Sequence, residues 1–272
     1  MPPPQSGARR LLLAVAALAL LGSAYIYWSH EPVPREVYDA VVAGDLALVR
    51  QRVAEGGDVN WAPPESGFGP LHEAVFKNRP DIAGFLVAHG ADVNAQGVFG
   101  DAPLHDVRHI GFARLLLDSG ARTDVSSNTL GTPLHAAVMH SEPALVRLLI
   151  EYGANADAPD VNGSTPLHHA AGLGDLASAR LLVDRGATID ALNGPGYASL
   201  HWAAGNGRYE MAAWLLARGA DPEIRAMDGR SAADAARARG YMAVAELIEG
   251  ATHASPKDSS APAVGRHFSA DP

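Results

Sequence analysis

Apolar positions along the chain gather into short triplets that recur at nearly constant intervals. These triplets are Phe85–Val87, Leu115–Leu117, Leu148–Ile150, Leu181–Val183 and Trp214–Leu216. A glycine follows each triplet after two further residues. Glycine readily adopts the left-handed backbone conformation that ends a helix, because it has no Cβ to clash. We therefore predict a helix over each triplet, with the triplet on its buried face and the glycine at its end.

A second recurring pattern lies before each triplet, and it predicts another helix. Its five copies share a leucine followed by a histidine, and the histidines are His72, His105, His135, His168 and His201. Thr132 and Thr165 are N-cap candidates, whose hydroxyls accept a hydrogen bond from a free backbone N–H. Pro133 and Pro166 then fall at the first helical position, where the missing N–H has no cost. Each interval of the chain is thus expected to form two helices.

The histidines of this pattern are separated by 33, 30, 33 and 33 residues. Such a period is typical of stacked arrays in which neighbouring units complete each other's core. Each unit resembles an ankyrin repeat, with Thr-Pro-Leu-His-x-Ala opening one helix and Gly-Ala-Asp-Val-Asn following the next; Gly90–Asn94 matches the latter in full. The resemblance covers about residues 37–250. It implies an all-α ankyrin-repeat solenoid of helix-turn-helix units with β-hairpin-like loops, in which the histidines bond backbone and tie adjacent repeats together.

The resemblance divides the chain into full repeats between two degenerate capping units. The expected full repeats are 61–94, 95–124, 125–157, 158–190 and 191–223. The capping units are 35–60 and 224–250, and the second has Asp234 in place of the histidine, with Arg237, Arg239 and Glu246 decorating its helices. The remaining parts are a leader at 1–30, a spacer at 31–36 before the repeat domain at 37–250, and a tail at 251–272. We expect this tail to be disordered because it is rich in Ser, Ala and Pro.

The repeat at 95–124 is three residues shorter than its neighbours. Aligning Gly120 with Gly90 places the gap after His109, near the end of the first helix. Three residues are nearly one turn of an α-helix. We predict a shortened first helix there, with a local change in stacking.

Two histidines of this short repeat raise the question of metal chemistry. His105 and His109 are four residues apart, a spacing that would place two ligands on one helix face. The repeat pattern already accounts for His105, and no third ligand is evident. We therefore expect no metal, no cofactor and no enzyme activity. A metal-dependent enzyme using this pair, and a passive membrane-tethered spacer, are the alternatives to a protein-binding role.

The resemblance implies that partners bind a concave face formed by the first helices and the hairpin tips. The candidate contacts on the helices are Glu73, Phe76, Lys77, Asp106, Met139, His140, His169, Leu173 and Trp202. Trp202 is the strongest candidate because aromatic residues dominate binding hot spots, although packing on a neighbouring helix or Tyr197 would also explain it. Near adjacent hairpin tips, Trp61, Phe68 and Phe99 either pack the hairpins or anchor a partner. We predict an exported ankyrin-repeat adaptor or inhibitor, a monomeric array that binds an unidentified protein.

An uncharged run of 18 residues, Leu11–Trp28, follows Arg9 and Arg10. As a helix it would span about 27 Å, close to the hydrocarbon thickness of a bilayer. A signal anchor, a cleaved signal peptide with a small-residue site at Gly22–Ala24, and a buried soluble helix are the three interpretations. We predict the anchor, hence an N-terminal apolar helix and a single-pass inner-membrane protein with its repeats in the periplasm. Secretion to the periplasm after cleavage is the alternative.

Composition adds three points to this picture. The net charge of −9 and the pI near 5.7 argue against nucleic-acid binding, because phosphate would be repelled. The absence of cysteine excludes a disulfide framework and a lipoprotein anchor. Arginine far outnumbers lysine, which occurs only at Lys77 and Lys257, a bias that we expect of a GC-rich bacterial genome.

Overall fold

The computed structural model describes residues 35–254, and all of the elements in that range are helices. The chain divides into two compact units at Arg122 and Thr123. Within the described residues, β-structure is limited to two isolated bridges inside loops, Ser127 with Gly131 and Arg225 with Ser231. The predicted all-α class is therefore confirmed, and the hairpin-like loops contain no named strands in this range.

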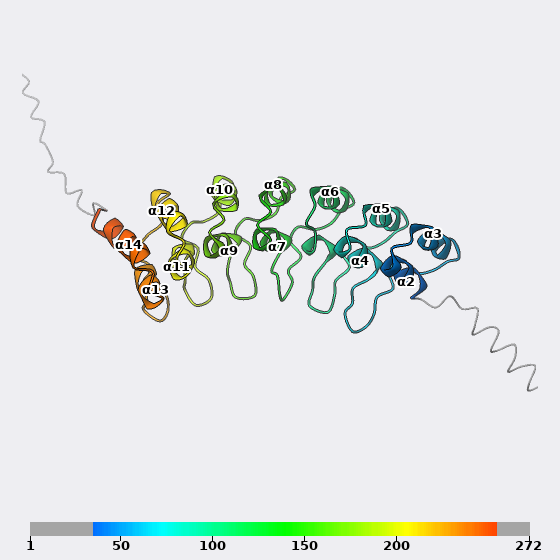
Figure 1. Ribbon diagram of the computed structural model, residues 1–272, viewed down its shortest axis with the longest axis horizontal. Coiled ribbons are helices and arrows are strands. Elements are labelled where there is room, and N and C mark those ends of the chain that lie inside the picture. The colour runs from blue at the N-terminus through cyan, green and yellow to red at the C-terminus, as the bar shows by residue number, and fades with distance from the viewer. Residues whose placement is uncertain (1–34, 255–272) are drawn as a thin grey trace, which may run out of the picture. The chain divides into compact units, whose positions relative to one another are not determined.

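The first unit contains three helix pairs in its described part. They are α2 (Glu36–Ala43) with α3 (Leu46–Ala54), α4 (Pro70–Phe76) with α5 (Pro80–Ala88), and the 3₁₀ helix η1 (Pro103–His105) with α6 (Ile110–Asp118). In Figure 1, the helices α3, α5 and α6 lie along one side of this unit, and α2 and α4 lie along the other.

The second unit contains four helix pairs in its described part. They are α7 (Pro133–Met139) with α8 (Pro143–Glu151), α9 (Pro166–Leu173) with α10 (Leu176–Asp184), α11 (Ser199–Gly205) with α12 (Tyr209–Ala217), and α13 (Ala232–Ala238) with α14 (Met242–Ala254). Within this unit, α7, α9 and α11 form one row, α8, α10 and α12 form another, and the loops before the first helices extend away from the second row (Figure 1).

The core of each unit is built from the apolar positions that recur in the sequence. The leucines that precede the motif histidines are buried in all five copies: Leu71, Leu104, Leu134, Leu167 and Leu200. The central residues of the triplets are fully buried as well: Leu86, Leu116, Leu149, Leu182 and Leu215. Burying a leucine side chain contributes about 2 kcal/mol of hydrophobic free energy. The prediction of a buried stripe is therefore confirmed for the central residue of each triplet, whereas most of the flanking triplet residues are half-buried.

Buried histidines connect consecutive repeats, as the resemblance implied. In His135, Nδ1 accepts the backbone N–H of Thr132 at 3.1 Å, and Nε2 lies 3.0 Å from the carbonyl oxygen of Ser164 in the next repeat. His72, His168 and His201 make the same two contacts with their own neighbours. Burial lowers the pKa of all four, that of His135 to about 4. This pattern requires a neutral ring with its proton on Nε2, which donates to the carbonyl.

The first helix of the short repeat is reduced to a single 3₁₀ turn, Pro103–His105, so the predicted shortening is confirmed. The expectation that His105 and His109 share a helix face is wrong. The helix ends at His105, which is fully buried, whereas His109 is exposed and has extended backbone angles before α6. Across residues 35–254, the structure has no cluster of three or more His, Cys, Asp or Glu side chains suited to a metal ion.

The predicted inner-membrane location with a periplasmic repeat domain is contradicted. Within residues 35–254, no helix is long and apolar enough to cross a bilayer. The longest helix there, α14, has 13 residues and would span about 20 Å, compared with a hydrocarbon core of about 30 Å. The segment on which the prediction rested, Leu11–Trp28, lies outside the described residues.

At the other end of the chain, α14 continues through Ala254, four residues into the segment expected to be disordered. Within this helix, the Thr252 hydroxyl donates a 2.7 Å hydrogen bond to the carbonyl oxygen of Glu249. The rest of that segment, 255–272, lies outside the described residues.

Candidate functional site

Two adjoining cavities of about 510 and 520 Å³ lie in the second unit. Their walls come from α7, α9, α11 and α13 and from the loops that precede these helices. Five lining residues are common to both cavities: Asp160, Asn162, His169, Trp202 and Asn206. The two cavities therefore form one continuous depression, which we call the groove.

A hydrogen-bonded pair, Asp160 with His169, lies between the two halves of the groove. Nε2 of His169 is 3.0 Å from Oδ2 of Asp160, and the two side chains are 20% and 10% exposed. Oδ1 of Asp160 accepts the backbone N–H groups of Asn162 and Ser164 at 2.8 and 2.9 Å. Burial alone would raise the pKa of Asp160, but these hydrogen bonds outweigh burial and lower it. The carboxylate is therefore ionised, and it accepts three hydrogen bonds.

The next repeat carries a different pair at the equivalent positions, Asn193 and Trp202. Oδ1 of Asn193 accepts the N–H of Tyr197 at 2.9 Å, as Asp160 accepts that of Ser164, and its amide donates to the Ser164 hydroxyl at 3.2 Å. The carboxylate with its histidine is thus replaced by an amide with a tryptophan. This difference gives the groove an aromatic wall beside the Asp160 carboxylate.

The half-buried Trp202 packs on α9 and still contributes surface to the groove. Its ring is edge-on to His168 and His169, with ring centroids 6.0 and 5.2 Å apart. Gly172 leaves room for it, because a Cβ there would lie 3.0 Å from Cε3 of the indole. The indole N–H finds no hydrogen-bond acceptor among residues 35–254. Trp202 therefore offers both an apolar surface and an unused donor.

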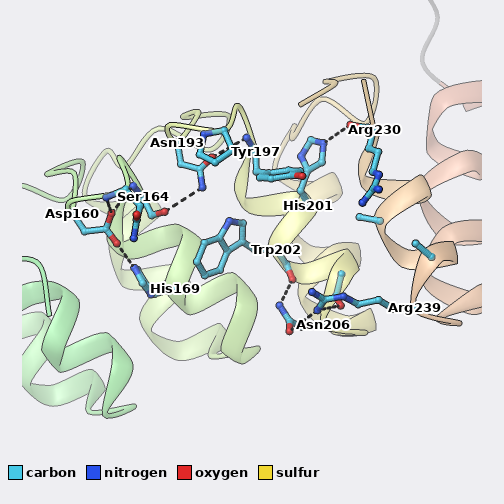
Figure 2. Close-up of a pocket in the computed structure, with 15 residues that line it drawn as sticks. Asp160, Ser164, His169, Asn193, Tyr197, His201, Trp202, Asn206, Arg230 and Arg239 are labelled. Atoms are coloured by element: carbon cyan, nitrogen blue, oxygen red, sulfur yellow. Dashed lines mark hydrogen bonds and ion pairs between the residues drawn. The ribbon is translucent and has the colours of Figure 1, made fainter. Parts of the chain in front are cut away.

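The two ends of the groove differ in chemistry. Arg230 and Arg239 line the end at α11 and α13, and Figure 2 shows them on the opposite side of Trp202 from Asp160 and His169. Met139, Val161 and Leu173 line the end at α7 and α9. One end is therefore basic and the other is apolar.

The groove brings together four of the residues that the sequence singled out: Trp202, His169, Met139 and Leu173. His140 immediately follows α7 and is not among the groove residues.

The other helix candidates belong to the first unit. Phe76 is 72% exposed, and Asp106 directly follows η1. Glu73 accepts a hydrogen bond from the Tyr38 hydroxyl at 3.3 Å, and Lys77 lies 3.9 Å from the same carboxylate.

Two of the three aromatic residues near the hairpins are packed within the first unit. The ring of Trp61 is edge-on to Tyr38, with centroids 5.6 Å apart. Phe68 stacks on His72 at 5.0 Å and packs so tightly on Gly97 that a Cβ there would overlap its ring. Phe99 differs, because 54% of its surface is exposed.

The sequence reasoning missed Asp160, Asn193, Arg230 and Arg239 as groove residues. Asp160 and Asn193 each lie eight residues before a motif histidine, and comparing that position between repeats would have paired them with His169 and Trp202. Arg239, expected to decorate the capping helices, directly follows α13 and reaches α11, where its Nη1 donates to the Gly205 carbonyl oxygen at 2.8 Å.

Comparison with protein families agrees with this architecture. The family described as ankyrin repeats (3 copies) matches residues 104–193 and 162–226, and a single ankyrin repeat matches residues 66–98. Human protein phosphatase 1 regulatory subunit 27 is 39% identical over 67 residues, which cover 25% of this chain and 43% of that protein. The mouse RelA-associated inhibitor is 45% identical over 67 residues, 25% of this chain and 8% of that protein. The chain thus spans less than half the length of these relatives.

Among solved structures, the crystal structure of the ankyrin repeat domain of Bcl-3 superimposes with a TM-score of 0.66 and is 30% identical in sequence. The alignment covers 78% of this chain and 97% of that domain. Together with the matched families and the repeated histidine contacts, this similarity shows that the chain belongs to the ankyrin-repeat family.

Proposed function

We propose that this protein is an adaptor or inhibitor that acts by binding another protein, and that the groove of the second unit is its principal contact site. The observation that carries the proposal is Trp202, a half-buried tryptophan in a groove whose indole N–H has no acceptor among the described residues. Buried aromatic anchors with a polar handle dominate the energy of protein interfaces.

The relatives are consistent with a regulatory role. The names of two of them describe a regulatory subunit of protein phosphatase 1 and a RelA-associated inhibitor. A protein of this kind needs no catalytic group of its own, because occupying a partner's surface is enough to block or redirect that partner. We extend this mode of action to the present chain, but not the identity of the relatives' partners.

The exposed candidates of the first unit form a secondary contact in this proposal. Phe76 is 72% exposed and Phe99 is 54% exposed, so both offer apolar area without disturbing the core. Neither residue lines the groove. We therefore expect them to add area to an interface whose affinity depends mainly on Trp202.

Site-specific crosslinking tests the proposal. A photoreactive phenylalanine analogue at Leu173, which lines the groove, is expected to give a discrete covalent adduct with a partner in the source cells. The same analogue at Arg180, on the exposed surface of α10, is the control position. Trp202→Ala should reduce the Leu173 adduct at least tenfold, because truncating a hot-spot residue costs about 2 kcal/mol or more.

Trp214→Ala is the matched control, since Trp214 lies on α12 beside Arg218 and away from the groove. It should leave the adduct unchanged. The proposal is wrong if the Leu173 adduct survives Trp202→Ala in a protein whose circular dichroism shows that it is folded.

A further inference from the structure

We infer that the groove binds an extended segment of the partner protein that carries an apolar side chain at one end and an acidic side chain about five or six residues away. This inference rests on the proposed function and specifies the chemistry of the partner. It is carried by the continuity of the groove and by the charges and exposure of its two ends.

The shape of the groove favours an extended occupant. The two cavities share five lining residues, and their outer walls lie on different repeats. A compact ligand would fill one cavity of about 510 Å³ and leave the other empty. A peptide in extended conformation can cross the shared residues and occupy both.

The apolar end is exposed to a degree that is unusual for such side chains. Leu173 is 43% exposed and Val161 is 61% exposed, with Met139 half-buried beside them. A flexible methionine with two branched aliphatic side chains accommodates an aliphatic or aromatic residue of a partner. Covering them would remove apolar area from water, which favours binding by about 25 cal/mol per Å².

The basic end has positive charge that the chain itself does not fully compensate. Arg239 pairs with no carboxylate among residues 35–254; its Nη1 donates instead to the carbonyl oxygen of Gly205 and to the side-chain oxygen of Asn206. Arg230 is 61% exposed and lies 3.5 Å from Asp228, whose carboxylate also accepts the Tyr197 hydroxyl. A guanidinium group offers several N–H donors in a plane, which suits a carboxylate.

The acidic residue of the groove does not cancel this charge. Asp160 is held by His169 and by two backbone N–H groups, and it lies on the opposite side of Trp202 from the two arginines. Although the whole chain carries a net charge of −9, the free charge at this end of the groove is positive. Charge complementarity therefore selects an acidic side chain there.

The spacing of the two anchors follows from the packing of the helices. Neighbouring packed helices lie about 8–10 Å apart, and the ends of the groove are about two such spacings apart, or roughly 18 Å. An extended chain advances about 3.3 Å per residue. Five or six residues of the bound segment therefore separate its apolar anchor from its acidic anchor. Trp202 lies between the two ends of the groove, where its indole N–H can donate to a backbone carbonyl oxygen of the segment.

Selection from a phage library of random dodecapeptides against the full chain tests the inference. We expect the enriched peptides to share a large apolar residue and an Asp or Glu five or six positions away. Binding of a synthetic consensus peptide, followed by fluorescence anisotropy, should weaken about tenfold in Arg239→Glu and less in Arg239→Gln, which retains a donor for Gly205. Arg180→Glu makes the same charge change on α10 and should have no effect.

The outcomes separate the two proposals. Peptides that depend on Trp202 but show no acidic position, or that bind Arg239→Glu as well as wild type, overturn the inference and leave the groove as the binding site. Enriched peptides whose binding is unaffected by Trp202→Ala, or the absence of any enriched peptide, overturn the proposed function as well. Selection against Arg239→Glu should replace the acidic residue by Lys or Arg.

Discussion

At the scale of single residues, the position eight places before the motif histidine makes two kinds of contact in the repeats at 158–190 and 191–223. Its oxygen holds the hairpin loop by accepting a backbone N–H, as Asp160 does for Ser164 and Asn193 does for Tyr197. Its second polar atom faces the groove region, where Asp160 meets His169 and Asn193 meets the Ser164 hydroxyl. Both repeats therefore use this position to hold the hairpin loop, but the side chain that it contacts in the groove region differs between them.

Because this position makes two kinds of contact, we predict different losses of stability for two substitutions of Asp160. Asp160→Asn keeps an oxygen for the loop, as Asn193 shows, and should lower the free energy of unfolding by about 1 kcal/mol through loss of the charged bond to His169. Asp160→Ala leaves the N–H groups of Asn162 and Ser164 without their acceptor and should cost about 2–3 kcal/mol. Urea unfolding at pH 7 measures both. Equal losses would show that the loop bonds contribute nothing.

At the scale of elements, the first helices open in two ways. Proline occupies the first position of α4, η1, α7 and α9, whereas α11 begins with Ser199. The Ser199 hydroxyl is buried and has no hydrogen-bond partner. Ala198 before it has φ −89° and ψ 169°, an extended conformation that a following proline favours. The helix start of α11 is therefore less favourable than those of α4, η1, α7 and α9.

We predict that Ser199→Pro stabilises the protein by about 1 kcal/mol. The substitution removes an unsatisfied buried hydroxyl and restricts the unfolded chain, while the N–H that is lost has no role at the first helical turn. Ala232→Pro in α13 is the control, because it occupies the same helical position without a buried hydroxyl and should gain less. Thermal unfolding monitored by circular dichroism compares them. A lower melting temperature for Ser199→Pro would refute this account.

At the scale of the whole molecule, the histidine contacts link stability to pH in both units. One of these histidines, His72, belongs to the first unit, and the second unit contains the other three, His135, His168 and His201. Burial lowers the pKa of all four. An unfolded histidine binds a proton near pH 6.5, whereas the folded ones stay neutral to lower pH. The unfolded chain therefore binds more protons than the folded chain below pH 6.5. The free energy of unfolding consequently decreases as the pH is lowered through this range.

We predict that the free energy of unfolding is constant above about pH 7 and falls as the pH is lowered from 6.5 toward 4. His135, whose pKa in the folded protein is about 4, contributes roughly 3 kcal/mol to this loss when the window is fully crossed. Urea unfolding between pH 7.5 and 5 measures the slope above the range in which carboxylates titrate. Substituting the exposed His109 by Gln should leave the slope unchanged. A flat profile between pH 7 and 5 would contradict the neutral-histidine assignment.

Much of the fold could be predicted because its determinants are local and repeat. Leu134 and Leu149 occupy positions whose burial follows from helical periodicity, and the same residues recur in each repeat. The three-residue deletion before α6 predicted a short helix for the same reason. The interpretation of His105 and His109 failed because it assumed that the helix continued past the deletion.

The sequence by itself determined the repeat architecture and the buried leucines, because both depend on spacing within one repeat or between adjacent repeats. The contacts of the motif histidines followed from the resemblance to ankyrin repeats. Only the tertiary structure decided that Asp160, His169, Trp202 and Arg239 line one groove. These residues come from three successive repeats and match no shared motif, so their proximity depends on how the side chains of neighbouring repeats pack. The chemistry of the groove, basic at one end and apolar at the other, is a consequence of that packing.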